Sequence, residues 1–132
     1  MSSLDVVAEQ LRIGLRDDWS ESDLVRLIAD AVHEFELIQS ATEQWSYLEP
    51  EPRPTGDSGW DAVLAGLAVH LARLAAFDRT PAWSREPSRY SPTFRWIGLS
   101  PDSEMKAYVF QRTPIYFKSR GVMIDAANLA SV

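Results

Sequence analysis

The chain has 132 residues, of which 45% are hydrophobic and 24% charged, values typical of one globular domain with a buried core. Its net charge of -6 disfavours sequence-independent binding to nucleic acid, which requires a basic surface that displaces counterions. The absence of cysteine excludes disulfides, thiolate metal sites and cysteine nucleophiles, and is compatible with a reducing compartment. No apolar run is long enough to span a bilayer, and acidic residues interrupt the apolar N-terminus, unlike a signal peptide. We therefore expect a cytoplasmic protein that does not contact a membrane.

The N-terminal third of the chain has the periodicity of amphipathic helices. Apolar residues recur at helical spacing over residues 4–16 and again over residues 23–40, which predicts two helices. Residues 41–48 either extend the second helix or form a short helix of their own. We expect these elements to make an N-terminal helical pair over residues 1–48.

A proline- and glycine-rich stretch at residues 49–59 cannot continue a helix and is expected to form a loop. It separates the helical pair from the main core, residues 60–132. Residues 58–76 carry the strongest periodic signal in the chain and predict one continuous helix at the centre of that core. The side chains expected to be buried along it are Trp60, Leu64, Leu67, Leu71 and Leu74.

The C-terminal half is interrupted by prolines. Residues 78–99 contain three prolines and four large aromatic residues, which predicts an irregular segment pinned to the core by its aromatic side chains. Ser100-Pro101 and Thr113-Pro114 each combine a capping residue with a proline, and so predict two helix starts. Gly121 is expected to close the second of these helices, and residues 122–124 could form a short strand.

Short polar residues mark the other helix starts. Ser20 or Ser22 is the expected N-cap of the second helix, and Asp57 or Ser58 that of the central helix. Asp125 is expected to cap a last turn near the C-terminus. The sequence as a whole predicts an all-α fold, or nearly so, with about five helices in a single domain over residues 1–132.

No motif supports catalysis or metal binding. The tetrapeptide Gly56-Asp57-Ser58-Gly59 also surrounds the nucleophile of trypsin-like proteases, but that chemistry needs a histidine base, an oriented aspartate and a double β-barrel. Asp30, His33 and Glu36 fan across one helix and would need partners from a second element to hold a metal. We expect no catalytic, metal-binding or cofactor-binding residue, and no cofactor.

Arg112, Lys118 and Arg120 form a small basic cluster beside Tyr116 and Phe117. Basic and aromatic residues together can bind single-stranded nucleic acid. Because the cluster is short and the chain is acidic, we favour a structural role for these charges at a helix end, with no direct contact to nucleic acid.

The chain from Gly56 onward resembles a family of short actinobacterial proteins regarded as antitoxins, which are often paired with a separate small toxin enzyme. The matching segments are GDSGWDAVLAGLAVHLARLA, PAWSREPSRY, FRW and TPIYFKSRGVMIDAANL. The family pattern has more arginine at the positions of Tyr116 and Lys118. The resemblance implies a non-catalytic protein that neutralises a toxin encoded nearby by direct contact.

Two groups of residues are candidates for that contact. Asp30, Glu34 and Glu36 lie off the apolar stripe of the second helix and could attract a basic partner. The second group comprises Tyr116, Phe117 and Arg120. A regulatory accessory domain that acts with a DNA-binding partner is the alternative function, and a small enzyme with an unrecognised site is a third. Self-association stays open.

Overall fold

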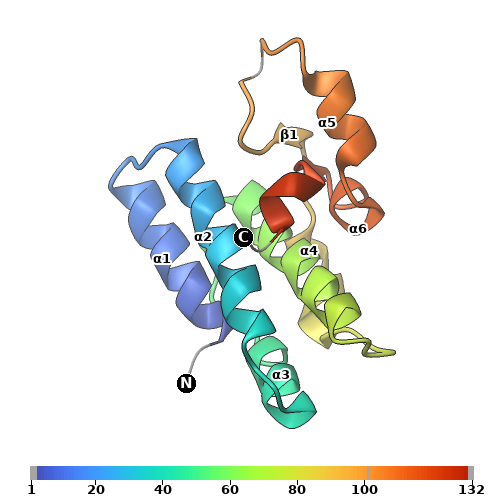
Figure 1. Ribbon diagram of the computed structural model, residues 1–132. Helices are drawn as coiled ribbons and strands as arrows, with labels where there is room; N and C mark the ends of the chain where they lie inside the picture. The colour runs from blue at the N-terminus through green and yellow to red at the C-terminus, as the bar shows by residue number, and fades with distance from the viewer. Residues whose placement is uncertain (1–2, 101, 131–132) are drawn as a thin grey trace.

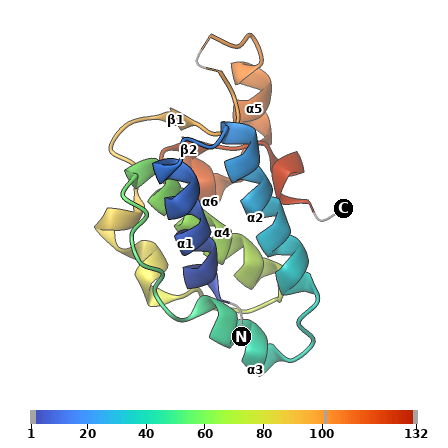
Figure 2. The ribbon, with the colours of Figure 1, turned by 90° about the vertical axis from the view of Figure 1, so that its left-hand side faces the viewer.

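Three N-terminal helices pack around a fourth, central helix (Figures 1 and 2). The computed structural model describes residues 3–100 and 102–130. Helix α1 spans Leu4–Arg16, α2 spans Glu21–Glu36 and α3 spans Ala41–Leu48. Each of the three contacts the central helix α4, Ser58–Leu74, and α1 also packs along α2.

Local capping determines where these helices begin. The Ser20 hydroxyl accepts a hydrogen bond from the Asp23 N–H at 3.1 Å, which decides between the two serines expected for α2. Ser40 accepts from the Glu43 N–H in the same way, so residues 41–48 form a helix of their own. At α4 the cap is Asp57, whose carboxylate accepts from the N–H groups of Gly59 and Trp60.

Helix α4 forms the centre of the hydrophobic core, as its periodicity predicts. Trp60, Leu64, Leu67 and Leu71 are buried. The prediction is wrong for Leu74, which is 50% exposed because the helix ends there and its last turn leaves the core.

The proline-rich segment forms two 3-10 turns, η1 (Ala82–Arg85) and η2 (Pro87–Arg89), followed by strand β1 (Arg95–Trp96). Trp83 pins the segment to the core, since it is buried and its indole N–H donates to the Leu48 carbonyl at 3.0 Å. The expectation that all of the aromatic residues would do so is wrong. Tyr90 and Phe94 are exposed.

The remaining elements are α5 (Lys106–Arg112), α6 (Ile115–Lys118), strand β2 (Val122–Met123) and η3 (Ala126–Leu129). Strands β1 and β2 pair in parallel, with Arg95 opposite Val122. The strand expected at residues 122–124 is therefore present, and Asp125 caps η3 by accepting from the Ala127 N–H.

Of the two helix starts predicted from a capping residue and a proline, the one at Thr113-Pro114 is present, since α6 begins at Ile115, and the one at Ser100-Pro101 is misplaced. The Ser100 carbonyl accepts from the Ser103 N–H in a turn, Pro101 lies outside the described residues, and α5 begins only at Lys106. The Thr113 hydroxyl donates to the Val109 carbonyl at the end of α5 instead of capping α6. Gly121 does adopt the left-handed conformation expected after α6, with φ of 81°.

The described residues bear out the all-α prediction: they form six α-helices, one hydrophobic cluster includes residues from Leu4 to Leu129, and the only sheet among them has two short strands. Within the same residues, no helix is both long and apolar enough to cross a membrane.

Candidate functional site

Helix α5 and the chain that leads into it project from the body of the molecule (Figure 1). Of its seven residues only Val109 is buried. Exposed apolar side chains lie on this helix and on either side of it, including Met105, Tyr108 and Ile115. The projection therefore presents apolar surface to its surroundings instead of burying it against the core.

Five side chains on this projection and on the neighbouring α6 form one contiguous group, which we call the arm cluster: Phe94, Trp96, Lys106, Phe110 and Lys118. The ring of Phe94 contacts Trp96 edge-on at 5.9 Å and stacks on Phe110 at 6.5 Å between centroids. The ammonium group of Lys106 lies 5.5 Å from the Trp96 ring, and that of Lys118 lies 4.1 Å from the Phe110 ring. Lysine thus flanks the aromatic side chains at both ends.

The charges of the arm cluster are unusual for this chain. Lys106 and Lys118 are the only two lysines in the whole sequence. Neither forms an ion pair within the described residues, whereas seven arginines do. Two cations without a carboxylate partner, beside exposed aromatic rings, are suited to contact an acidic, partly apolar surface.

The acidic candidates on α2 are exposed, as the sequence predicts. Asp30, Glu34 and Glu36 all lie on the solvent side of that helix. Asp30 borders a shallow hollow of about 280 Å³ next to Trp19. Glu36 borders a different hollow, with His70. These carboxylates are accessible to a partner, but they do not converge on a single site.

Two of the three C-terminal candidates are buried in the fold. Phe117 is fully buried, and a Cβ placed on Gly66 of α4 would come within 2.4 Å of its ring. Arg120 is 6% exposed and donates to the carbonyls of Tyr116 and Ser84, both at 2.7 Å. Both side chains are therefore buried in the fold, and their part in partner binding stays a prediction.

Tyr116, the third C-terminal candidate, is half-buried against α4. Its hydroxyl lies 2.7 Å from Nδ1 of His70. Burial lowers the pKa of His70, an effect opposed by Glu36 and reinforced by Arg73. Burial also raises the pKa of the Tyr116 hydroxyl. At neutral pH this is a neutral His–Tyr hydrogen bond that ties α6 to α4.

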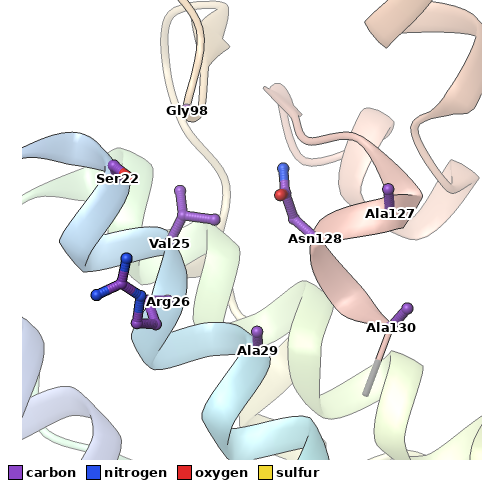
Figure 3. A pocket seen from close by; sticks show the side chains of 8 residues that line it. All are labelled: Ser22, Val25, Arg26, Ala29, Gly98, Ala127, Asn128 and Ala130. Carbon is purple, nitrogen blue, oxygen red and sulfur yellow. The ribbon is translucent and has the colours of Figure 1, made fainter. Parts of the chain in front are cut away.

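A separate pocket of about 360 Å³ lies between α2 and η3 (Figure 3). Small side chains such as Ala29 and Ala127 form much of its wall, and Gly98 closes one end. Arg26 is the one ionisable group among the described residues that line it. Such a lining offers no pair of groups for acid–base chemistry.

The motifs considered for catalysis have structural roles in this fold. Asp57 caps α4 and binds Arg95 at 2.9 Å, which holds the pKa of the Asp57 carboxyl below its usual value although burial alone would raise it. Ser58 is exposed at the start of α4, about 18 Å along the helix from His70. No group of three or more potential metal ligands occurs in the described part of the chain.

Comparisons with known protein families, with curated proteins and with solved structures found no match. The arm cluster was missed by the sequence analysis because aromatic residues between prolines were expected to anchor the segment to the core. The restriction of lysine to positions 106 and 118 was the signal that could have indicated it.

Proposed function

We propose that the protein is a non-catalytic binding protein of the cytoplasm that neutralises a toxin by direct contact. The protein-binding part of this proposal is carried by the arm cluster, in which Phe94 and Phe110 stack on each other yet remain 57% and 40% exposed. The antitoxin part is supported by the resemblance of the chain from Gly56 onward to that class of protein.

The composition of the arm cluster favours a protein partner over nucleic acid. Aromatic side chains contribute much of the binding energy at protein interfaces, and charged residues at the rim mainly orient the partner. Single-stranded nucleic acid would instead require free ring faces on which bases can stack. Phe110 already stacks on Phe94, and the ammonium group of Lys118 lies over its ring, so a base would have to displace these contacts in order to stack there.

The length of α5 supports the same conclusion. An isolated helix of seven residues is marginally stable in water, and most helices gain their stability from packing of an apolar face. With Val109 as its one buried residue, α5 has little such packing within the chain. A partner that covers Phe110 and Tyr108 would stabilise the helix and remove their apolar surface from water.

The carboxylates of α2 have a different role in the proposed complex. Asp30, Glu34 and Glu36 are exposed, so their charges are screened by salt and would contribute mainly to the rate of association. The arm cluster would then supply the central apolar contact.

The direct test is co-expression with the product of the adjacent gene, followed by co-purification and a growth-rescue assay. We expect the neighbour to be toxic alone and harmless in the complex, and Phe110→Ala to weaken rescue. Val6→Ala is the matched control, because Val6 is also exposed but lies on α1.

Two outcomes separate the alternatives. A neighbour that is harmless alone and does not co-purify would contradict the antitoxin function. A DNA-binding protein recovered with the chain, in a complex that Phe110→Ala weakens, would support the accessory-domain function instead.

A further inference from the structure

The arginines of the chain fall into groups according to what their guanidinium groups contact. Of eleven arginines, seven form ion pairs with carboxylates. Arg120 is buried and donates to backbone carbonyls. The remaining three, Arg73, Arg79 and Arg85, have no carboxylate within ion-pair distance in the described structure, and all three line one pocket of about 400 Å³.

This pocket, which we call the arginine pocket, is formed where α4 ends. The Ala76 N–H donates to the Arg73 carbonyl and the Phe77 N–H to the Ala72 carbonyl, a Schellman pair that turns the chain back beside the helix. Ala76 adopts the left-handed conformation that this turn requires, with φ of 59°. The turn therefore places residues 77–80 next to the last turn of α4.

Contacts that leave the charge available hold two of the guanidinium groups in place. Arg85 donates to the Thr80 hydroxyl at 2.6 Å and to the Thr80 carbonyl at 3.3 Å. The Arg79 guanidinium lies 3.9 Å from the centroid of the Trp45 ring. Hydroxyl, carbonyl and aromatic contacts orient a guanidinium without neutralising it.

The balance of charge in the pocket is positive. Asp78 is the one carboxylate among the described lining residues, against three guanidinium groups. On a chain of net charge -6, this is a local excess of positive charge in a concave place. Guanidinium groups donate pairs of parallel hydrogen bonds that match the oxygens of a phosphoryl group.

We propose that the arginine pocket binds the phosphoryl groups of a small phosphorylated ligand. Arg73, Arg79 and Arg85 contact the phosphoryl oxygens, and a diphosphate is preferred over a monophosphate because three arginines line the pocket. A second hollow of about 290 Å³ adjoins the pocket, shares Phe77 and Arg79 with it, and includes Trp45. It offers aromatic surface to the remainder of the ligand. This site is independent of the proposed partner binding.

Isothermal titration of the full chain at low salt tests the proposal, with pyrophosphate, inorganic phosphate, ADP and adenosine as the probes. We expect pyrophosphate and ADP to bind, phosphate to bind more weakly, and adenosine not to bind. ADP that binds more tightly than pyrophosphate identifies a nucleotide as the source of the phosphoryl groups, whereas equal affinities identify the diphosphate alone. Chloride at matched ionic strength is the control for general screening.

Arg85→Gln should weaken pyrophosphate binding about tenfold or more, the usual effect of losing a charge-assisted hydrogen bond. Arg79→Lys, which keeps the charge but loses the planar fork, should weaken it by a smaller factor. Arg16→Gln is the control, since it removes the same charge from an exposed arginine that pairs with Asp17. Circular dichroism melts establish that each variant is folded. The proposal is overturned if no phosphorylated probe binds, or if Arg85→Gln and Arg16→Gln bind pyrophosphate equally.

Discussion

Among the described residues, two other than glycine adopt positive φ angles: Asp18 at 60° and Ala76 at 59°. Side chains with a Cβ are disfavoured in this left-handed region by about 1–2 kcal/mol. Aspartate tolerates the conformation better than alanine because its short polar side chain can form local hydrogen bonds. Ala76 is therefore the more strained of the two, and it is held there by the hydrogen bonds that end α4.

Ala76→Gly should stabilise the protein. Glycine removes the left-handed cost but makes the unfolded chain more flexible, and the difference leaves a gain of about 0.5–1 kcal/mol. The measurement is the free energy of unfolding in urea. Ala107→Gly, on the exposed side of α5 where no positive φ is required, is the control and should not stabilise. A destabilised Ala76→Gly variant would contradict the strain argument.

His70 should make stability depend on pH. Burial lowers its pKa below the ordinary value of 6.5, so the unfolded chain takes up a proton at a higher pH than the folded protein does. The stabilising contribution of His70 is complete above that value and is lost as the pH falls below it. Melting temperatures between about pH 8 and pH 5 should therefore fall less steeply for His70→Gln than for the wild type.

The control for this prediction is Tyr116→Phe, which removes the 2.7 Å contact to the hydroxyl but keeps the imidazole. Parallel pH profiles for His70→Gln and the wild type would contradict a buried, neutral His70.

At the scale of single residues, local roles were predictable from the sequence and long-range roles were not. The Asp57 cap depends on a neighbour three residues away, and so the sequence indicated it. Phe117 fills the space above Gly66, a contact between residues 51 positions apart that no local pattern reveals. The burial of Arg89 was equally unpredictable, because its guanidinium group donates to the distant carbonyl of Pro52 at 2.5 Å.

Helix α4 supplies a matched comparison between a buried and an exposed leucine. Leu67 is completely buried, and truncation to alanine should cost about 2–5 kcal/mol through lost transfer energy and a residual cavity. Leu74→Ala, on the last turn of the same helix, should change stability by less than about 1 kcal/mol because half of the side chain is already exposed. Chemical denaturation of both variants measures the difference, and equal losses would contradict the placement of α4 in the core.

Elements with strong periodicity were predicted well, and elements stabilised by distant contacts were not. The apolar stripe of α4 is a property of consecutive turns, so the sequence alone indicates it. Strand β1 exists because Arg95 and Trp96 lie beside residues 122 and 123, and its two residues carry no strand pattern. The start of α5 was misplaced because a favourable cap and proline do not ensure that the following turn is packed.

Acidic and basic residues are concentrated in different segments of the chain. Residues 17–51 contain ten Asp or Glu and a single Arg, whereas residues 106–120 contain four Lys or Arg and no carboxylate. The first range covers α2 and α3, and the second covers α5 and α6. A partner that contacts both must present basic groups toward α2 and acidic groups toward the arm cluster, which limits the orientations in which it can bind.

The two surfaces should therefore affect different rate constants with a co-purified partner. Glu34→Gln with Glu36→Gln should slow association and flatten its dependence on salt, because these exposed carboxylates act through long-range attraction. Phe110→Ala should instead accelerate dissociation, because it removes apolar contact at the centre of the interface. Biolayer interferometry at several salt concentrations separates the two effects. Glu43→Gln with Glu86→Gln is the control, since it makes the same change in net charge at exposed positions outside α2 and the arm cluster. A Phe110→Ala variant that dissociates at the wild-type rate would remove the arm cluster from the interface and leave the acidic face of α2 as the remaining candidate.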